Sequence, residues 1–176
     1  MVTYILIFVN VLIFILIRMG KLDPGYLSSS YHSVFNRKEY YRIITAAFTH
    51  VEVLHLFCNM SSLWSVGSFV ESAFGSGRML LIYFVSLILG RIFAMLIRHS
   101  NHDDYTESIG ASGAICGLLG TYFLVIVYFY GLSAFQTLLR PLASLLILSV
   151  LPGVDGTSHF CCMAVGMALT FLLFLI

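Results

Sequence analysis

Charged residues are scarce in this sequence. Lys, Arg, Asp and Glu make up 10% of its 176 residues, whereas hydrophobic residues make up 60%. Ordinary soluble domains carry about 25% charged residues. A soluble core of this size could not bury so much apolar surface, so the composition predicts a membrane protein. The length fits one domain, residues 1–176.

The sequence also lacks the patterns that hold metals, disulfides or nucleic acid. Its four cysteines lie in apolar segments without a CxxC pair, which favours buried free thiols over disulfides or a zinc site. We therefore expect neither a metal nor another cofactor. The formal net charge is +1 and no basic tract is present to bind phosphates, so nucleic acid is not an expected partner.

Long apolar runs are abundant. Spanning the hydrocarbon takes about 20 apolar residues in a helix, and the candidate spans are residues 1–17, 52–71, 79–97, 112–132, 141–152 and 159–176. They predict an all-α membrane protein with six transmembrane helices. The first run has no basic n-region and no small-residue cleavage site, so we expect a retained helix. The run at 141–152 is short for a span, and we expect it to tilt or move.

A polar stretch from Arg18 to about Arg42 separates the first two spans. It is long for a connection between membrane helices, and its tyrosines suit the headgroup level, so we predict an interfacial first loop with short amphipathic helices. Five of the nine basic residues lie in this loop, and the positive-inside rule would place it in the cytoplasm. Six spans would put both termini on one side.

A few polar residues interrupt the apolar runs, and such residues mark functional sites by default because they are costly in a membrane. His55 and Asn59 are four residues apart and share one helix face. Ser112 stands near the start of the fourth span, and His159 opens the last one. Glycines and other small residues flank Ser112 and His159, which lets two helices approach closely.

These residue types together suggest acyl transfer. A serine becomes nucleophilic when a base takes its proton, and histidine is the usual base at neutral pH. His159 would activate Ser112, and His55 and Asn59 would stabilise an oxyanion together with free backbone N–H groups at the start of the fourth helix. No acidic residue obviously completes a triad, because Asp155 reads as a turn residue; a Ser-His dyad is the economical reading.

Each of these residues also has a structural interpretation that involves no catalysis. Gly113 and Gly117 form a common helix-packing pattern in which Ser112 is another small residue. His159 could bond a helix-end carbonyl, and His55 with Asn59 could form an interhelical polar clamp. Packing does not require these residues together, which favours the catalytic reading. For the polar Glu71 and Arg91, an internal ion pair or a snorkelling arginine is expected.

Three motifs resemble those of the rhomboid family of intramembrane serine proteases. HVEVLHLFCNM resembles the second-helix motif, GASGAICG the GxSG motif and SHFCCMAVG the last-helix motif. The resemblance covers nearly the whole chain as a minimal six-helix core. It implies that Ser112 is the nucleophile and His159 the base, and that His55 and Asn59, preceded by His50, stabilise the oxyanion. The residues implied in structural or packing roles are Arg42, Glu71, Gly110, Gly113, Gly117 and Gly166.

The sequence departs from the family pattern at three positions. Tyr41 stands where tryptophan is usual before Arg42. Cys162 replaces the glycine expected one turn after His159, and should crowd the approach of the last helix to the fourth. Cys116 stands where an aromatic residue often supports the histidine ring.

The resemblance also implies a topology and a substrate class. Both termini would be cytoplasmic and the first loop would lie on the outer side, against the positive-inside reading; we follow the family. The expected location is a bacterial plasma membrane, with multiple spans. Substrates would be transmembrane proteins that enter past the short fifth helix, about 141–151, while residues 152–157 cap a water-filled cavity above Ser112.

The main hypothesis is therefore an intramembrane serine endopeptidase that needs no cofactor. The alternative is a non-catalytic rhomboid-like protein that binds membrane helices for quality control or trafficking. A small transporter is a third class; it would predict that a conservative replacement of Ser112 leaves transport partly intact, and no convincing internal repeat supports it.

Overall fold

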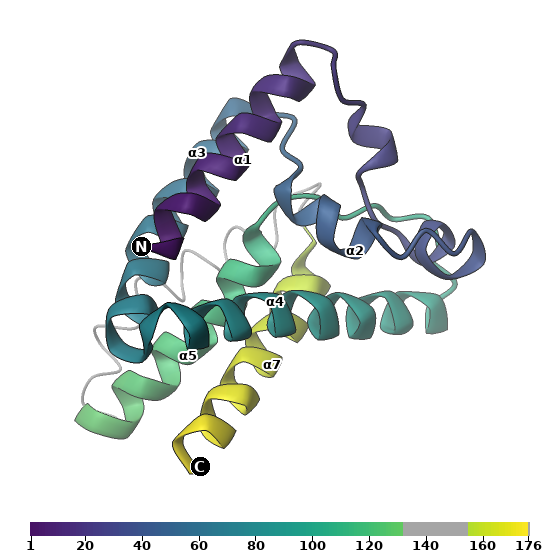
Figure 1. Ribbon diagram of the computed structural model, residues 1–176. Coiled ribbons are helices and arrows are strands. Elements are labelled where there is room, and N and C mark those ends of the chain that lie inside the picture. Colours follow the sequence, from purple (N-terminus) through teal and green to yellow (C-terminus); the bar gives the residue numbers. More distant parts are fainter. Residues whose placement is uncertain (132–154, 176) are drawn as a thin grey trace.

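The computed structural model describes residues 1–131 and 155–175 (Figure 1). Within these residues all regular secondary structure is helical. The longer helices are α1 (Val2–Arg18), α3 (Val53–Ser62), α4 (Ser68–Ser100), α5 (Ser112–Tyr130) and α7 (Gly156–Leu175). The short helical segments are η1 (Pro24–Tyr26), η2 (His32–Asn36), α2 (Arg42–Thr45), η3 (Ala46–Phe48) and η4 (Leu63–Gly67).

Among the residues that the structure describes, three helical runs are long and apolar enough to cross a membrane: Val53–Ser100, Ser112–Tyr130 and Gly156–Phe174. Helix α1 is apolar but shorter. The prediction of an all-helical membrane protein is therefore confirmed. Except for residue 52, the run Val53–Ser100 contains both predicted spans at 52–71 and 79–97. The predicted fifth span at 141–152 lies outside the described residues, so the count of six remains a prediction.

The longest helical run, Val53–Ser100, changes direction at Gly75. Its φ of 80° and ψ of 162° leave the helical region, while the residues on both sides stay helical. A non-glycine residue rarely adopts such a φ. Gly75 lies within α4, and Figure 1 shows the long part of α4 pointing in a different direction from the preceding α3. The predicted turn at 75–78 is thus reduced to one residue.

Glu71 ties the start of α1 to this corner. Its carboxylate accepts hydrogen bonds from the backbone N–H groups of Val2 at 2.7 Å and Thr3 at 3.0 Å, and from the hydroxyls of Thr3 and Ser76, both at 2.7 Å. An acidic group at a helix N-terminus satisfies free N–H groups and complements the helix dipole. Among the described residues Glu71 has no cationic partner, so the expected ion pair is not found there; its partners are backbone and hydroxyl donors.

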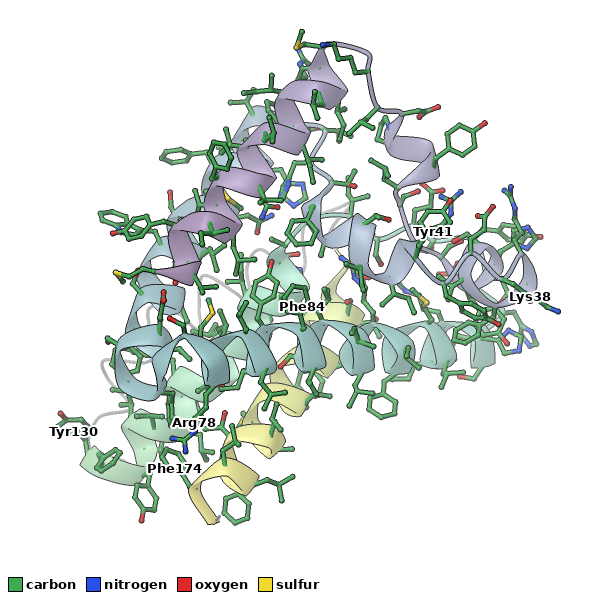
Figure 2. The ribbon with its side chains drawn as sticks, viewed as in Figure 1. Lys38, Tyr41, Arg78, Phe84, Tyr130 and Phe174 are labelled. Atoms are coloured by element: carbon green, nitrogen blue, oxygen red, sulfur yellow. The ribbon has the colours of Figure 1, made fainter. Side chains whose placement is uncertain are left out.

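The described chain begins and ends at the same end of the helix bundle. The Phe174 ring lies 5.3 Å from the Phe74 ring and 5.6 Å from the Tyr128 ring, and Val2 binds Glu71 close to Phe74. Figure 2 shows Arg78, Tyr130 and Phe174 together at this end, away from Lys38 and Tyr41 on the first loop. This arrangement fits an even number of spans.

The opposite end is built from the first loop, the 101–111 segment and the start of α7. Ser29 and Ser108 exchange backbone hydrogen bonds of 3.1 Å and 2.8 Å in an isolated antiparallel bridge. Tyr31 stacks on His99, with ring centroids 4.0 Å apart. These contacts hold the first loop over the end of α4, next to the segment that leads into α5.

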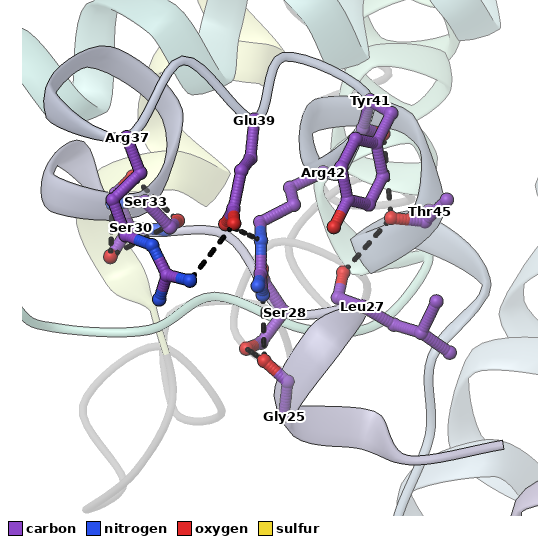
Figure 3. Close-up of polar contacts among 10 residues, drawn as sticks. All are labelled: Gly25, Leu27, Ser28, Ser30, Ser33, Arg37, Glu39, Tyr41, Arg42 and Thr45. Carbon is purple, nitrogen blue, oxygen red and sulfur yellow. Dashed lines mark hydrogen bonds and ion pairs between the residues drawn. The ribbon is translucent and has the colours of Figure 1, made fainter.

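Arg42 organises the first loop from inside (Figure 3). It is 2% exposed, and its guanidinium donates to Glu39 at 2.6 Å, to the Gly25 carbonyl at 2.6 Å and to the Ser28 carbonyl at 3.0 Å. Glu39 also pairs with Arg37 at 3.1 Å. One planar cation therefore closes a loop that has no extended regular structure of its own.

Replacing the carboxylate of Glu71 should destabilise the protein. In Glu71→Gln one acceptor becomes an NH₂ donor facing other donors, so we expect the free energy of unfolding to fall by about 1–3 kcal/mol. Reversible unfolding in detergent micelles measures this. The control is Glu107→Gln at an exposed carboxylate, and equal stability of the two variants would contradict the capping role.

Candidate active site

The structure brings Ser112 and His159 together. Ser112 is the first residue of α5, His159 lies in the first turn of α7, and the Ser112 Oγ is 2.7 Å from the His159 Nε2. His159 is 6% exposed, while Ser112 remains partly exposed. This pair can transfer a proton from hydroxyl to imidazole when the ring carries its own hydrogen on Nδ1.

Glycines set the distance between the two helices. A Cβ at Gly166 would lie 2.1 Å from the Gly117 carbonyl oxygen, so α7 rests directly on the backbone of α5. A Cβ at Gly117 would in turn meet the Ser86 side chain of α4 at 2.2 Å. Since no side chain fits at these positions, the three helices approach at backbone distance. The contact at Gly113 is less tight, because a Cβ there would lie 3.2 Å from the Cys162 sulfur.

The expected crowding by Cys162 is relieved by Gly90 on α4. Cys162 is fully buried, and a Cβ at Gly90 would lie 2.4 Å from its sulfur. The absence of a side chain at Gly90 thus makes the room that Cys162 needs. Cys116 is also buried, whereas Cys58 is exposed and Cys161 partly exposed, so the expectation of four buried thiols is right for two of them.

His55 and Asn59 face the segment that leads into Ser112. A Cβ at Gly110 would lie 2.7 Å from the His55 Nε2 and 3.2 Å from the Asn59 Nδ2. Gly110 also has a φ of +97°, which L-residues with side chains rarely adopt. Two requirements therefore select glycine here: the backbone conformation and the polar side chains of α3. The predicted face of α3 does lie next to the GASG turn.

His50 is a third member of this polar group. Its Nε2 is 2.9 Å from the Asn59 Nδ2 and 3.4 Å from the backbone nitrogen of Ala111, both of which are donors. Nε2 must therefore accept, which places the ring hydrogen on Nδ1. Burial, helped by the nearby His55, lowers the pKa of His50 to about 4, so the ring is neutral at physiological pH. The sequence pointed to His50 only as a neighbour of His55.

Asp155 anchors the start of α7. Its carboxylate accepts from the backbone N–H of Ser158 at 2.9 Å, which makes it the N-cap of the helix that carries His159. The same carboxylate binds the Arg98 guanidinium and the Ser108 hydroxyl. Asp155 was expected to be a simple turn residue; it instead joins α7 to α4 and to the segment before Ser112. Because the predicted last helix began at residue 159, the sequence did not mark Asp155 as its N-cap.

Arg91 is buried without a carboxylate partner among the described residues. It is 2% exposed, and its guanidinium donates to the Gly110 carbonyl at 3.0 Å and to the Ile43 carbonyl at 3.2 Å. The expectation that it would form an ion pair or snorkel to the membrane surface is therefore wrong. Within residues 1–131 and 155–175, no group of three His, Cys, Asp or Glu residues could hold a metal ion.

Comparisons with known proteins agree on one family. The family model for the Rhomboid domain matches residues 37–176. Rhomboid protease GluP of Bacillus subtilis is 36% identical over 128 residues, 70% of this chain and 24% of that protein. RHOMBOID-like protein 4 of Arabidopsis thaliana is 36% identical over 160 residues, 88% of this chain and 38% of that protein.

An inactive relative is also similar. Inactive RHOMBOID-like protein 8 of Arabidopsis thaliana is 36% identical over 91 residues, which is 52% of this chain and 24% of that protein. The family therefore includes both a named protease and a named inactive member. The chain spans less than half the length of each of these three relatives.

The N-cap hydrogen bond of Asp155 and its ion pair with Arg98 should contribute separately to stability. Asparagine at an N-cap still accepts from the helix N–H groups, whereas alanine does not. We expect Asp155→Ala to lower the free energy of unfolding by about 1 kcal/mol more than Asp155→Asn. Thermal unfolding in micelles measures the difference. Equal loss in both variants would mean that the ion pair with Arg98 alone matters.

The neutral state of His50 should appear in the pH dependence of stability. The unfolded ring protonates near pH 6.5 and the folded ring only near 4, so this contribution is present above pH 6.5 and is lost as the pH falls through 4. His50→Gln cannot titrate. We expect the free energy of unfolding to fall less between pH 7 and pH 4 in this variant than in the wild type. Parallel curves would contradict a neutral buried His50.

Proposed function

This chain belongs to the rhomboid family, and we propose that it is an intramembrane serine endopeptidase with Ser112 as nucleophile and His159 as base. The observation that carries this proposal is the 2.7 Å contact between the Ser112 Oγ and the His159 Nε2. Sequence similarity to a named rhomboid protease supports it further. Burial of His159 beside a partly exposed Ser112 is suited to a substrate that reaches the hydroxyl from one side.

In the proposed reaction the Ser112 Oγ attacks the carbonyl carbon of the scissile peptide bond while the His159 Nε2 takes its proton. The tetrahedral intermediate collapses as His159 gives that proton to the leaving amine, and the C–N bond breaks. Water then attacks the resulting ester with His159 again as base. The ester bond breaks, Ser112 regains its proton, and the acid product leaves.

The oxyanion would be stabilised by donors from two elements. His55 and Asn59 on α3 lie against Gly110, two residues before Ser112. Ser112 is the first residue of α5, where backbone N–H groups lack helical partners and the dipole favours negative charge. Donors that are already positioned before the reaction stabilise the transition state at little further cost.

We further propose that residues 1–176 form one six-span catalytic domain in a cellular membrane, with both termini in the cytoplasm and the first loop outside. The common location of Val2, Phe74 and Phe174 at one end of the bundle supports an even number of spans. The relatives named above come from a bacterium and a plant, so the proposal is not restricted to the bacterial plasma membrane.

Substrates would be transmembrane proteins whose helices unwind near the outer surface, since a helical peptide bond is shielded from Ser112. The expected gate at about 141–151 lies outside the described residues, as do residues 152–154 of the expected cap at 152–157. Asp155, which belongs to the expected cap, would hold the start of α7 in place through its contacts with Arg98 and Ser108. Neither a metal nor another cofactor enters the proposed reaction.

The alternative is a non-catalytic protein that binds membrane helices. The observation that favours it is the similarity to a relative named inactive. Retention of both Ser112 and His159, within hydrogen-bond distance, favours the protease.

Cleavage of a fluorescent transmembrane substrate by the purified chain in detergent tests the proposal. We expect Ser112→Ala and His159→Ala to lower the rate by at least about 10³-fold, because each removes a group that takes part in the proton transfer. Ser72→Ala, at an exposed serine whose hydroxyl bonds only locally to Phe69, is the control and should cut like the wild type.

Equal cleavage by the wild type and both active-site variants would contradict the dyad. Absence of cleavage by the folded wild type across a panel of transmembrane substrates, together with retained binding of those helices, would favour the non-catalytic alternative.

A further inference from the structure

Arg91 holds the peptide that joins Gly110 to Ala111. Its Nη2 donates to the Gly110 carbonyl at 3.0 Å, and the same guanidinium reaches the Ile43 carbonyl and the Ser29 hydroxyl at 3.2 Å and 3.5 Å. The Gly110 N–H donates to the Ala46 carbonyl at 2.8 Å. The residue two positions before Ser112 is thus fixed on both of its backbone polar groups.

A trans peptide transmits this contact to its other side. The carbonyl of Gly110 and the N–H of Ala111 belong to one planar unit and point in opposite directions. When Arg91 fixes the carbonyl, it fixes the direction of the N–H as well. That N–H lies 3.4 Å from the His50 Nε2, which also accepts from the Asn59 Nδ2 at 2.9 Å.

A continuous series of contacts therefore leads from α4 to α3. It runs from the Arg91 guanidinium through the Gly110–Ala111 peptide and the His50 ring to the Asn59 amide. His50 has one acceptor nitrogen, and the two donors share it. A rotation of the peptide would change how His50 meets Asn59, and the Asn59 amide would lose its fixed direction.

The burial of Arg91 is hard to explain by stability alone. A buried cation without a carboxylate partner costs free energy, and in a membrane such residues mark functional positions. A neutral donor such as glutamine could bind one carbonyl at lower cost. The planar guanidinium instead binds two carbonyls from separate segments at fixed angles.

We propose that Arg91 is a positioning residue that orients the Asn59 amide for the oxyanion, acting through the Gly110–Ala111 peptide and His50. This rests on the proposed protease function. The donor itself would be Asn59. Arg91 makes no contact with substrate in this proposal, and its effect should appear only in the transition state.

The test is a double-mutant cycle on the full chain, with the fluorescent transmembrane substrate. We expect Arg91→Met to lower kcat about tenfold at unchanged KM, less than the 10²–10³-fold loss from removing an oxyanion donor. Asn59→Ala should lower kcat by about 10²-fold. If Arg91 acts through Asn59, the double variant should be no slower than Asn59→Ala within about twofold.

Two further variants sharpen the cycle. Arg91→Lys keeps the charge but cannot bind two carbonyls in one plane, so kcat should be partly restored relative to Arg91→Met. Arg78→Met makes the same substitution at an exposed arginine on the same helix and should leave kcat unchanged. If Arg91→Met does not fold, Arg91→Lys replaces it in the cycle.

Three results would overturn the proposal: multiplicative losses in the double variant, a rise in KM without a fall in kcat, or failure of both Arg91 variants to fold. The last result would mean that Arg91 is needed only for folding. The wild type and Ser112→Ala, measured beside them, report separately on the proposed protease function.

Discussion

The backbone contact between α5 and α7 is the constraint on which the candidate site depends. Gly166 lies so close to the Gly117 carbonyl that no side chain could stand between them. Ser112 begins one of these helices and His159 lies in the first turn of the other. Their contact therefore depends on how closely the two backbones approach at Gly117 and Gly166, about one and a half to two turns further along the helices. Packing of small residues and the chemistry of the hydroxyl are two consequences of one sequence pattern, which is why either reading of GASGAICG alone is incomplete.

Around this contact, some buried polar groups pair with one another, as Thr121 does with Thr170, whereas several charged residues bind the backbone of helix ends and connecting segments. The membrane interior offers little water to satisfy a free N–H or C=O, so each helix end and each non-helical segment needs a protein partner. Glu71 serves the start of α1 and Asp155 the start of α7. Arg91 and Arg42 serve carbonyls of the connecting segments. These four of the 17 charged residues thus satisfy backbone groups at helix ends and in connecting segments.

The helices and the Ser112–His159 pair were predictable because residue type and spacing indicate them. Apolar runs located the described spans, and the flanking glycines indicated which helices could touch. The partners of Arg91 were not predictable, because carbonyl oxygens carry no sequence signal. The fit of Cys162 against Gly90 was also hidden, since the two residues are distant in sequence and only the three-helix packing joins them. Asp155 was misread for a related reason: its N-cap role follows from where α7 begins.

The single-residue corner at Gly75 has a consequence for how the gene can vary in length. Helical geometry continues up to Gly75 on both sides, so there is no longer non-helical segment that could accommodate an added or deleted residue. One residue more would turn α4 by about 100° around its own axis. Gly90 would then face away from Cys162, and Arg91 away from the carbonyl of Gly110. Insertions and deletions should therefore be absent from this corner in functional homologues, and should collect instead in the exposed tip of the 101–107 segment.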